Sequence, residues 1–196
     1  MVAIGAFLDA IARTVVMVAD AVTEGCGWIA RVLVAILIPV GFLNVFLRYV
    51  GRYTETQLVN NTWIEAQWYI YGVIFLLMFP VLLRHDGNVR VDFWYAERSE
   101  KTKTRIDLVG HLVALAPFVT LAVWVSYRPV LDSWRHWELS PDPGGLPRAP
   151  LKAMILAAFL LLGLQTIATL IRLGARLTGR EIGIRERRSD APLRIE

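Results

Sequence analysis

Hydrophobic residues form four long runs along the chain, and charged residues fall only near the ends of each run. The runs cover about residues 30–50, 63–83, 106–127 and 151–173. A helix needs roughly 20 mostly apolar residues to cross the hydrocarbon core of a bilayer. Each run must be helical, because an open strand in lipid would leave its backbone N–H and C=O groups unpaired. The pattern therefore predicts an all-α membrane protein with four transmembrane helices.

A fifth apolar segment precedes the first predicted span. Its charged residues, Asp9, Arg13, Asp20 and Glu24, are spaced by 4, 7 and 4 positions. At about 100° per residue they share one narrow sector of a helix. We therefore expect an amphipathic N-terminal helix over residues 1–27, and no cleaved signal peptide, because no basic segment opens it. Two interpretations remain open: the helix lies in the inner membrane interface, or it packs against a partner's membrane helices.

Basic residues are distributed unequally between the two sides of the predicted membrane domain, which spans residues 1–196. With four spans, both termini lie on the same side as the loop between the second and third spans. Fourteen of the 21 Lys and Arg residues fall on that side and six on the other. The positive-inside rule then predicts cytoplasmic termini, including a basic tail over residues 174–196. The sequence pI near 9.5 follows from this bias and does not indicate a nucleic-acid partner.

Composition agrees with a membrane protein and offers little for catalysis. Hydrophobic residues make up 56% of the chain and charged residues 19%, whereas about a quarter of a soluble domain is charged. One cysteine, Cys26, excludes an internal disulfide and a cysteine-rich metal site. We find no nucleophile beside a base, no zinc-type spacing and no phosphate-binding loop. The sequence thus predicts no enzyme, no metal and no cofactor.

One alternative with a cofactor rests on two histidines. His85 and His111 flank the predicted cytoplasmic loop, near the ends of adjacent spans. A haem b would need two imidazoles that face each other at one depth. His85 lies in a charged loop, while His111 is about one turn inside a span, so helix packing is the preferred role for His111.

Polar residues near the predicted outer membrane face are more informative. Asn44 and Arg48 share one helix face near the end of the first span, and Glu65 and Gln67 open the second. A charge at membrane depth tends to find a partner or a cavity. We expect Arg48 to pair with Glu65 across the first hairpin, with separate headgroup contacts as the alternative.

The two longer loops lead to different predictions. The stretch "NVRVDF" after the second span alternates apolar and polar residues, as an extended segment does. We expect the second span to end at Arg84, Gly87 to supply the turn that follows, and Ser99 to cap the next helix. The loop before the fourth span, "ELSPDPGGLPRAP", is predicted to be irregular and largely extended, because it is rich in proline and glycine.

The motifs together resemble one family. They are "NVFLRYV", "WIEAQWYIYGVIFLLMFPVLLR", "GNVRVDFWYAER" and "ELSPDPGGLPRAPLKA", which follow one another over most of residues 40–155. In order and spacing they are similar to the small membrane subunits of TRAP transporters, the DctQ-like family. The chain departs from that family pattern at Ala66, where a second acid is common, and at Asn88, where histidine is common.

The resemblance implies a function and a set of partners. In such systems a periplasmic binding protein captures an organic acid, and a large membrane subunit moves it by a sodium-driven elevator motion. The small subunit joins the static scaffold in the bacterial inner membrane and helps the binding protein to dock, with lipids around it and no nucleic acid. The residues that we expect to serve packing or partner contacts are Asn44, Arg48, Glu65, Arg84, Gly87, Arg90, Asp92, Glu138, Ser140 and Pro147.

Three other functions remain open at this point. The chain could be the membrane anchor of a redox enzyme, which would need the haem. It could be the small subunit of a tripartite tricarboxylate transporter, which has a similar size and span count. It could also be a self-contained small transporter, although no carboxylate lies at mid-membrane depth.

Overall fold

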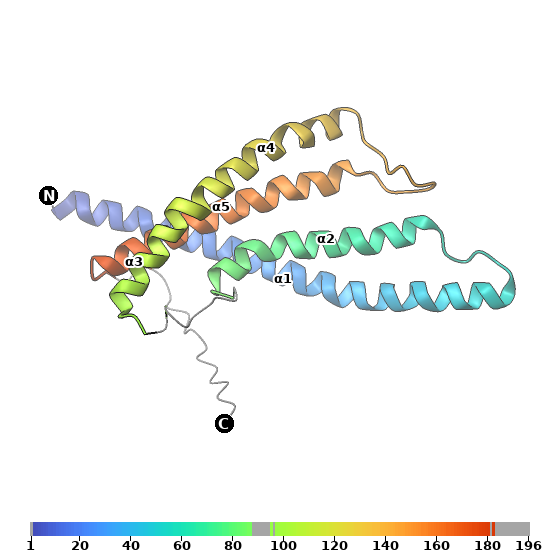
Figure 1. Ribbon diagram of the computed structural model, residues 1–196, viewed down its shortest axis with the longest axis horizontal. Coiled ribbons are helices and arrows are strands. Elements are labelled where there is room, and N and C mark those ends of the chain that lie inside the picture. Colours follow the sequence, from blue (N-terminus) through green and yellow to red (C-terminus); the bar gives the residue numbers. More distant parts are fainter. Residues whose placement is uncertain (1, 88–94, 96, 181, 183–196) are drawn as a thin grey trace, which may run out of the picture.

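The computed structural model consists of long helices arranged as two antiparallel hairpins (Figure 1). It describes residues 2–87, 95, 97–180 and 182, with side chains from Phe7 onward. The helices are α1 (Val2–Thr54), α2 (Asn61–Arg84), α3 (Glu100–Gly110), the π-helical turn η1 (His111–Leu115), α4 (Ala116–Arg135) and α5 (Ala149–Leu177). Four helical stretches are long and apolar enough to cross a membrane, with α3, η1 and α4 counted as one. The predicted all-α class with four spans is confirmed.

The two hairpins give the molecule two distinct ends. The start of α1, the end of α5 and the helix α3 lie at one end, which we call the terminal end (Figure 1). The connections over residues 55–60 and 136–148 lie at the other, which we call the loop end (Figure 1). Helix α5 contacts all the other helices, so it holds the two hairpins together.

Helix α1 is one unbroken element, and this differs from the expected separate N-terminal helix. It runs from Val2 to Thr54, 53 residues, with Pro39 inside it. Its buried positions near the terminal end follow a spacing of 3 and 4 residues, namely Val16, Ala19, Thr23, Cys26 and Ala30. That spacing keeps one line of residues facing the same neighbours along a straight helix. The amphipathic segment is therefore the first part of a helix that packs continuously on α5 and α2.

Small residues dominate the interior of the bundle. Val16 and Ala19 meet Ala168 of α5, while Cys26 and Ala30 meet Leu77 of α2. Small side chains let helix backbones approach closely, which is the usual way that membrane helices associate.

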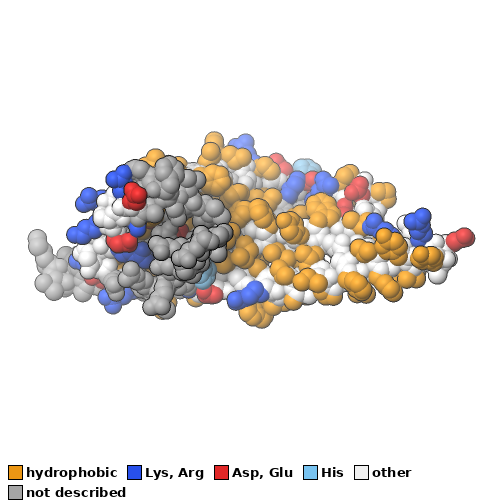
Figure 2. All heavy atoms as spheres, turned by 60° about the horizontal axis from the view of Figure 1, so that its bottom comes forward, with side chains coloured by type: hydrophobic (Ala, Val, Ile, Leu, Met, Phe, Trp, Pro, Cys, Tyr) orange, Lys and Arg blue, Asp and Glu red, His pale blue; other side chains and the backbone are white. Residues whose placement is uncertain are grey.

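Large apolar side chains point outward instead. Ile38 and Phe42 of α1 are each 68% exposed, and Trp124 of α4 is 75% exposed. Figure 2 shows hydrophobic side chains over the middle of one face, with charged groups gathered toward its ends. Such faces suit lipid or another membrane protein rather than water.

The end of α2 and the start of α3 lie where the sequence predicted them, and a widened turn precedes Pro117. Helix α2 ends at Arg84, and the side chain of Ser99 caps α3 by accepting from the Thr102 N–H. The turn η1 lies just before Pro117. Proline cannot donate a backbone hydrogen bond and crowds the carbonyl four residues earlier, which accounts for a wider turn at this place.

Candidate functional site

An ion-pair cluster joins three helices at the terminal end, and we call it the terminal-end cluster. Asp20 of α1 accepts a hydrogen bond from the Arg172 guanidinium of α5, and its carboxylate lies 3.6 Å from Nε of Arg84 in α2. Arg84 also donates to the Asp20 backbone carbonyl, at 3.2 Å, and to the Glu24 carboxylate. The side chains of Arg84 and Arg172 are only 12% and 13% exposed. Two acids and two bases thus neutralise each other where α1, α2 and α5 meet.

This cluster explains the polar stripe of the first helix. Three of its four charged residues pair within the chain: Asp20 and Glu24 in the cluster, and Asp9 with Arg180 at 2.8 Å. The Asp9 pair is more exposed than the cluster. The acidic residues of the stripe therefore pair with arginines of this chain. Neither the interfacial helix nor the partner-packing helix that the sequence suggested included this outcome.

A buried polar pair lies deeper in the same seam and was not predicted. The Thr23 hydroxyl donates to the side-chain oxygen of Gln165 at 2.8 Å, and Gln165 is fully buried. Among the described residues, the Gln165 amide nitrogen has no hydrogen-bond partner. The one signal in the sequence was a glutamine inside an apolar run, and its partner lies 142 residues earlier.

Asn44 of α1 helps to pack the first hairpin, and its partner on α2 is Gln67. Its side-chain amide donates to Gln67 Oε1 at 2.9 Å, and the Gln67 amide donates to the Val40 carbonyl at 3.1 Å. Asn44 is only 5% exposed. These bonds fix the register of α1 against α2, while Asn44 Oδ1 finds no hydrogen-bond partner within the described residues.

The expected pair between Arg48 and Glu65 is absent from the described part of the chain. Glu65 is 1% exposed and accepts hydrogen bonds from the Ser140 hydroxyl and the Leu146 backbone N–H. Arg48 is exposed on α1. The prediction was wrong because Glu65 points from α2 toward the second hairpin, where the loop before α5 offers two donors.

Glu65 organises a second cluster, which we call the loop-end cluster. The Thr62 hydroxyl donates to the Gly144 carbonyl, and the Tyr69 hydroxyl donates to the Leu146 carbonyl at 3.3 Å. Three residues of α2, one turn apart, therefore hold the segment 144–146 in place. These contacts join the loop of the second hairpin to α2 of the first hairpin.

Glycine is required at two positions of that loop. Gly144 has a φ of +71°, a conformation that other residues rarely adopt. A Cβ at Gly145 would lie 2.8 Å from a Glu65 carboxylate oxygen and closer still to Ser140. The loop can thus close over Glu65 only because position 145 carries no side chain.

The loop itself is more ordered than the prolines suggested. Leu139 and Pro147 form an isolated antiparallel bridge, and the Ser140 N–H donates to the Leu146 carbonyl at 3.2 Å. The Arg148 N–H donates to the Glu138 carbonyl at 2.8 Å. The expected irregular, largely extended loop is therefore a short closed structure, because Gly144 and Gly145 turn the chain back on itself.

Glu138 anchors the loop to both helices of the second hairpin. Its carboxylate accepts from Ser133 of α4, at 2.8 Å, and from Lys152 of α5. The Lys152 ammonium, followed by the Ser133 hydroxyl, holds the pKa of Glu138 below its ordinary value, since both favour the charged carboxylate. The charged form of Glu138 therefore keeps the loop attached at neutral pH.

The remaining expected residues have different outcomes. Arg90 and Asp92 lie outside the described residues, as do Asn88 and the tail beyond Ile182. Gly87 does not supply the turn itself, because the positive φ belongs to Asp86, at 51°. The Gly87 N–H instead donates to the Leu82 carbonyl, which completes the end of α2.

The two histidines of the haem alternative have separate partners. His85 lies 3.6 Å from Glu24, while Nδ1 of His111 is 2.6 Å from the Asp107 carbonyl. Within the described ranges, no group of three or more metal-type side chains comes together. What the two clusters can do chemically is bind helices and a loop to one another.

Comparisons with known proteins point to one family. The model of the DctQ component of tripartite ATP-independent periplasmic transporters matches residues 37–176, which include the loop-end cluster and both basic residues of the terminal-end cluster. An MFS-type transporter, TwmF of Talaromyces wortmannii, is 32% identical over 111 residues. That alignment covers 54% of this chain but only 18% of the fungal protein, so the chain spans about a fifth of that relative's length. No solved structure matches the chain.

Proposed function

Because the chain belongs to the family of DctQ components, we propose that it is the small scaffold subunit of a transporter that takes up an organic acid with sodium. It is a multi-pass membrane protein and a transport subunit, not an enzyme. Members of this family in general work with a large membrane subunit and a substrate-binding protein. The large subunit would carry the substrate by an elevator motion, and this chain would stay still beside it.

The observation that carries this proposal is the contrast between the inside and the outside of the bundle. Inside, Asn44, Glu65 and Gln165 each make a hydrogen bond with another residue of this chain. Outside, large apolar side chains such as Phe42 and Trp124 stand exposed on α1 and α4. A subunit that carried solute would need polar groups directed at a path, whereas a scaffold needs a fixed interior and apolar faces for a partner.

The orientation follows from charge. We place the terminal end in the cytoplasm of a bacterium and the loop end in the periplasm, because the side with the termini holds most of the Lys and Arg residues. The protein then sits in the inner membrane with the loop-end cluster facing the compartment of the binding protein. Cysteine labelling from either side of sealed vesicles, at Thr56 and Thr178, would reveal an inverted orientation directly.

The loop end suits a docking surface for the soluble partner. Trp137 and Leu139 are 50% and 61% exposed, and they flank the closed loop that Glu138 and Glu65 hold. A loop that is already fixed loses little conformational entropy on binding, so it favours affinity. We therefore assign Glu138, Ser140 and Pro147 the task of shaping this surface, rather than touching the partner themselves.

Reconstitution tests the proposal. The chain alone in proteoliposomes should give no uptake of any organic acid, and the chain with its large subunit and binding protein should give uptake that a sodium gradient drives. Omission of this chain from the complete set should abolish uptake. Uptake by the chain alone, or full uptake without it, would show that it is not a scaffold subunit.

Two further observations separate the alternatives. Co-purification should recover the large subunit of a TRAP system; recovery of a tricarboxylate transporter's large subunit would reassign the chain. A Soret band in the purified chain would support a redox anchor instead.

A further inference from the structure

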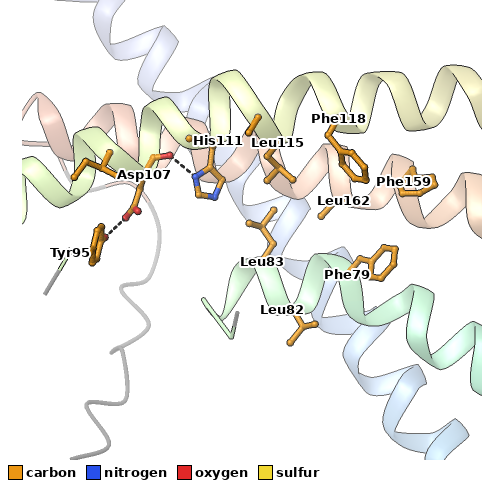
Figure 3. Close-up of a pocket in the computed structure, with 13 residues that line it drawn as sticks. Phe79, Leu82, Leu83, Tyr95, Asp107, His111, Leu115, Phe118, Phe159 and Leu162 are labelled. Carbon is orange, nitrogen blue, oxygen red and sulfur yellow. Dashed lines mark hydrogen bonds between the residues drawn. The ribbon is translucent and has the colours of Figure 1, made fainter. Parts of the chain in front are cut away.

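A cleft opens between the two hairpins at the terminal end. Its volume is about 1060 Å³. One wall is the end of α2, the second is formed by α3, η1 and the start of α4, and the floor is α5 (Figure 3). Apart from three residues at one end, the lining side chains are apolar. Its lining includes Phe79, Tyr95, Asp107, His111, Phe118 and Phe159.

The cleft has a polar end and an apolar end. At the polar end the Tyr95 hydroxyl donates to the Asp107 carboxylate at 2.7 Å, and the His111 ring bonds the Asp107 carbonyl (Figure 3). At the other end Phe159 meets Phe79 and Phe118, with ring centroids 6.3 and 6.1 Å apart. The chemistry thus changes from hydrogen-bonding groups to three aromatic rings along one cavity.

The polar end and the aromatic end of the cleft lie at different depths along the membrane-spanning helices. Asp107 lies near the start of the third span, and Phe118 lies 11 residues further along it, about 16 Å deeper at 1.5 Å per residue. Phe79 lies five residues inside Arg84, the last residue of α2 and a member of the terminal-end cluster. The polar end therefore sits at headgroup level and the aromatic end within the hydrocarbon.

Two small residues account for the opening in the wall. Gly110 and Ala114 line the cleft one turn apart, and a Cβ built at Gly110 would have no heavy atom within 4 Å. The widened turn η1 begins directly after Gly110. The gap is therefore a feature of this wall, and a larger side chain at either lining position should narrow the cleft.

We propose that the cleft binds one acyl chain of a phospholipid from the leaflet at the terminal end. An apolar cavity of this size does not stay empty in a bilayer, and water would find few hydrogen-bond partners beyond the polar end. Acyl chains are the surrounding solvent at this depth. Asp107, Tyr95 and His111 then lie where the glycerol and headgroup of the same lipid would be, and the chain lies against the three phenylalanines.

Photo-crosslinking tests the site in the full chain. The chain, and separately its complex with the large subunit, is placed in vesicles of phosphatidylethanolamine and phosphatidylglycerol that contain a phospholipid with a diazirine near the end of one acyl chain. Peptide mass spectrometry then locates the label. We expect enrichment on the peptides with Phe79 and Phe159 over the other membrane-spanning peptides of the chain, in both samples.

Two filling variants and one matched control give the contrast. Ala114→Phe and Gly110→Leu should each reduce the label on those two peptides by about tenfold, the ratio that 1.4 kcal/mol of lost binding gives. Val113→Phe adds the same ring on the same turn, but Val113 is not one of the residues that line the cleft, so its label should stay within about twofold of the parent chain. Circular dichroism and gel-filtration profiles establish that each variant is folded.

Three results would overturn the proposal. Label on the cleft peptides that is unchanged in both folded filling variants would show that no chain enters. Label spread evenly over all lipid-facing segments would show general solvation only. Label present in the chain alone but lost in the complex would mean that the large subunit, and not a lipid, fills the cleft.

Discussion

The terminal-end and loop-end clusters solve the same problem in different ways. At the terminal end, Asp20 and Glu24 meet Arg84 and Arg172, so charge is balanced by charge between side chains of three helices. At the loop end, Glu65 is bound by a hydroxyl and a backbone N–H from a single loop. The first cluster depends on which side chains are present, and the second depends on how a loop is folded.

This difference decides what each end tolerates. A helix can present an arginine from several positions, so the terminal-end cluster needs charge and approximate register only. The backbone N–H of Leu146 reaches Glu65 only when the loop closes, and closure requires that Gly145 lack a side chain. Substitution of an uncharged residue such as Gly145 can therefore open the loop end, whereas the terminal end should respond mainly to loss of charge.

The largest expected effect comes from Asp20→Ala. It removes the carboxylate partner of Arg172, whose side chain is only 13% exposed, while Arg84 keeps its ion pair with Glu24. Removing one partner of such a buried pair costs about 3 kcal/mol. Equilibrium unfolding of the purified chain in mixed micelles measures the loss. Asp9→Ala is the matched control, because its pair with Arg180 is exposed and should contribute less than about 1 kcal/mol. If both variants lost the same free energy of unfolding, the terminal-end cluster would contribute no more than the exposed pair of Asp9 and Arg180.

The next effect concerns the loop end and uses Gly145→Ala. The added methyl would collide with Glu65 and Ser140, so the loop should separate from α2. Amide hydrogen exchange at Ser140 and Leu146 should rise by about tenfold or more, with α1 and α5 unchanged. Asp142→Ala alters an exposed side chain of the same loop and should leave exchange as it is. A Gly145→Ala loop with parental exchange rates would mean that Glu65 is not its anchor.

Low pH should weaken the attachment of the loop at the loop end, with a smaller effect than Gly145→Ala and gradually with pH. The pKa of Glu138 is lowered by Lys152 and Ser133, so its charged form stabilises the folded loop above its ordinary pKa, and this contribution is lost as pH falls through the lowered value. Fluorescence of Trp134 and Trp137 should change only well below neutral pH. In Lys152→Met the same change should begin at a higher pH. An identical titration in both chains would exclude Lys152 as the cause.

The smallest effect is expected for Arg48→Ala. Arg48 is exposed and makes no ion pair within the described chain, so the free energy of unfolding should change by less than about 0.5 kcal/mol. Exchanging the charges, Arg48→Glu with Glu65→Arg, should be no better than Glu65→Arg alone when thermal stability is compared. If the double exchange were more stable than Glu65→Arg alone, the pair between Arg48 and Glu65 that the sequence predicted would be supported after all.

The elements were predictable because they follow from local pattern. Apolar runs of sufficient length marked the four spans, Arg84 marked the end of α2, and Ser99 marked the start of α3. Each of these depends on residues that are neighbours in the sequence, and the bilayer allows few alternatives to a helix.

The contacts between elements were not predictable in the same way. Glu65 and Ser140 are 75 positions apart, and the choice of Ser140 over Arg48 depends on the direction in which one face of α2 points. Matched depth and opposite sign could not supply that direction. Asp20 was recognised as part of a stripe, yet its partner at Arg172 becomes visible only when α5 lies beside α1. The family resemblance added the function but none of these pairings.

The length of α1 has a physical consequence for how the protein sits in its membrane. At 1.5 Å per residue its 53 residues measure about 80 Å, while the hydrocarbon layer is about 30 Å thick. Tilt within the usual range of up to about 40° takes up only part of that surplus. The apolar turns of α1 that extend beyond the hydrocarbon layer must pack against other apolar groups, which a bilayer of uniform thickness or a detergent belt does not provide. Preparations of this chain on its own should consequently be sensitive to the choice of surfactant and to acyl-chain length.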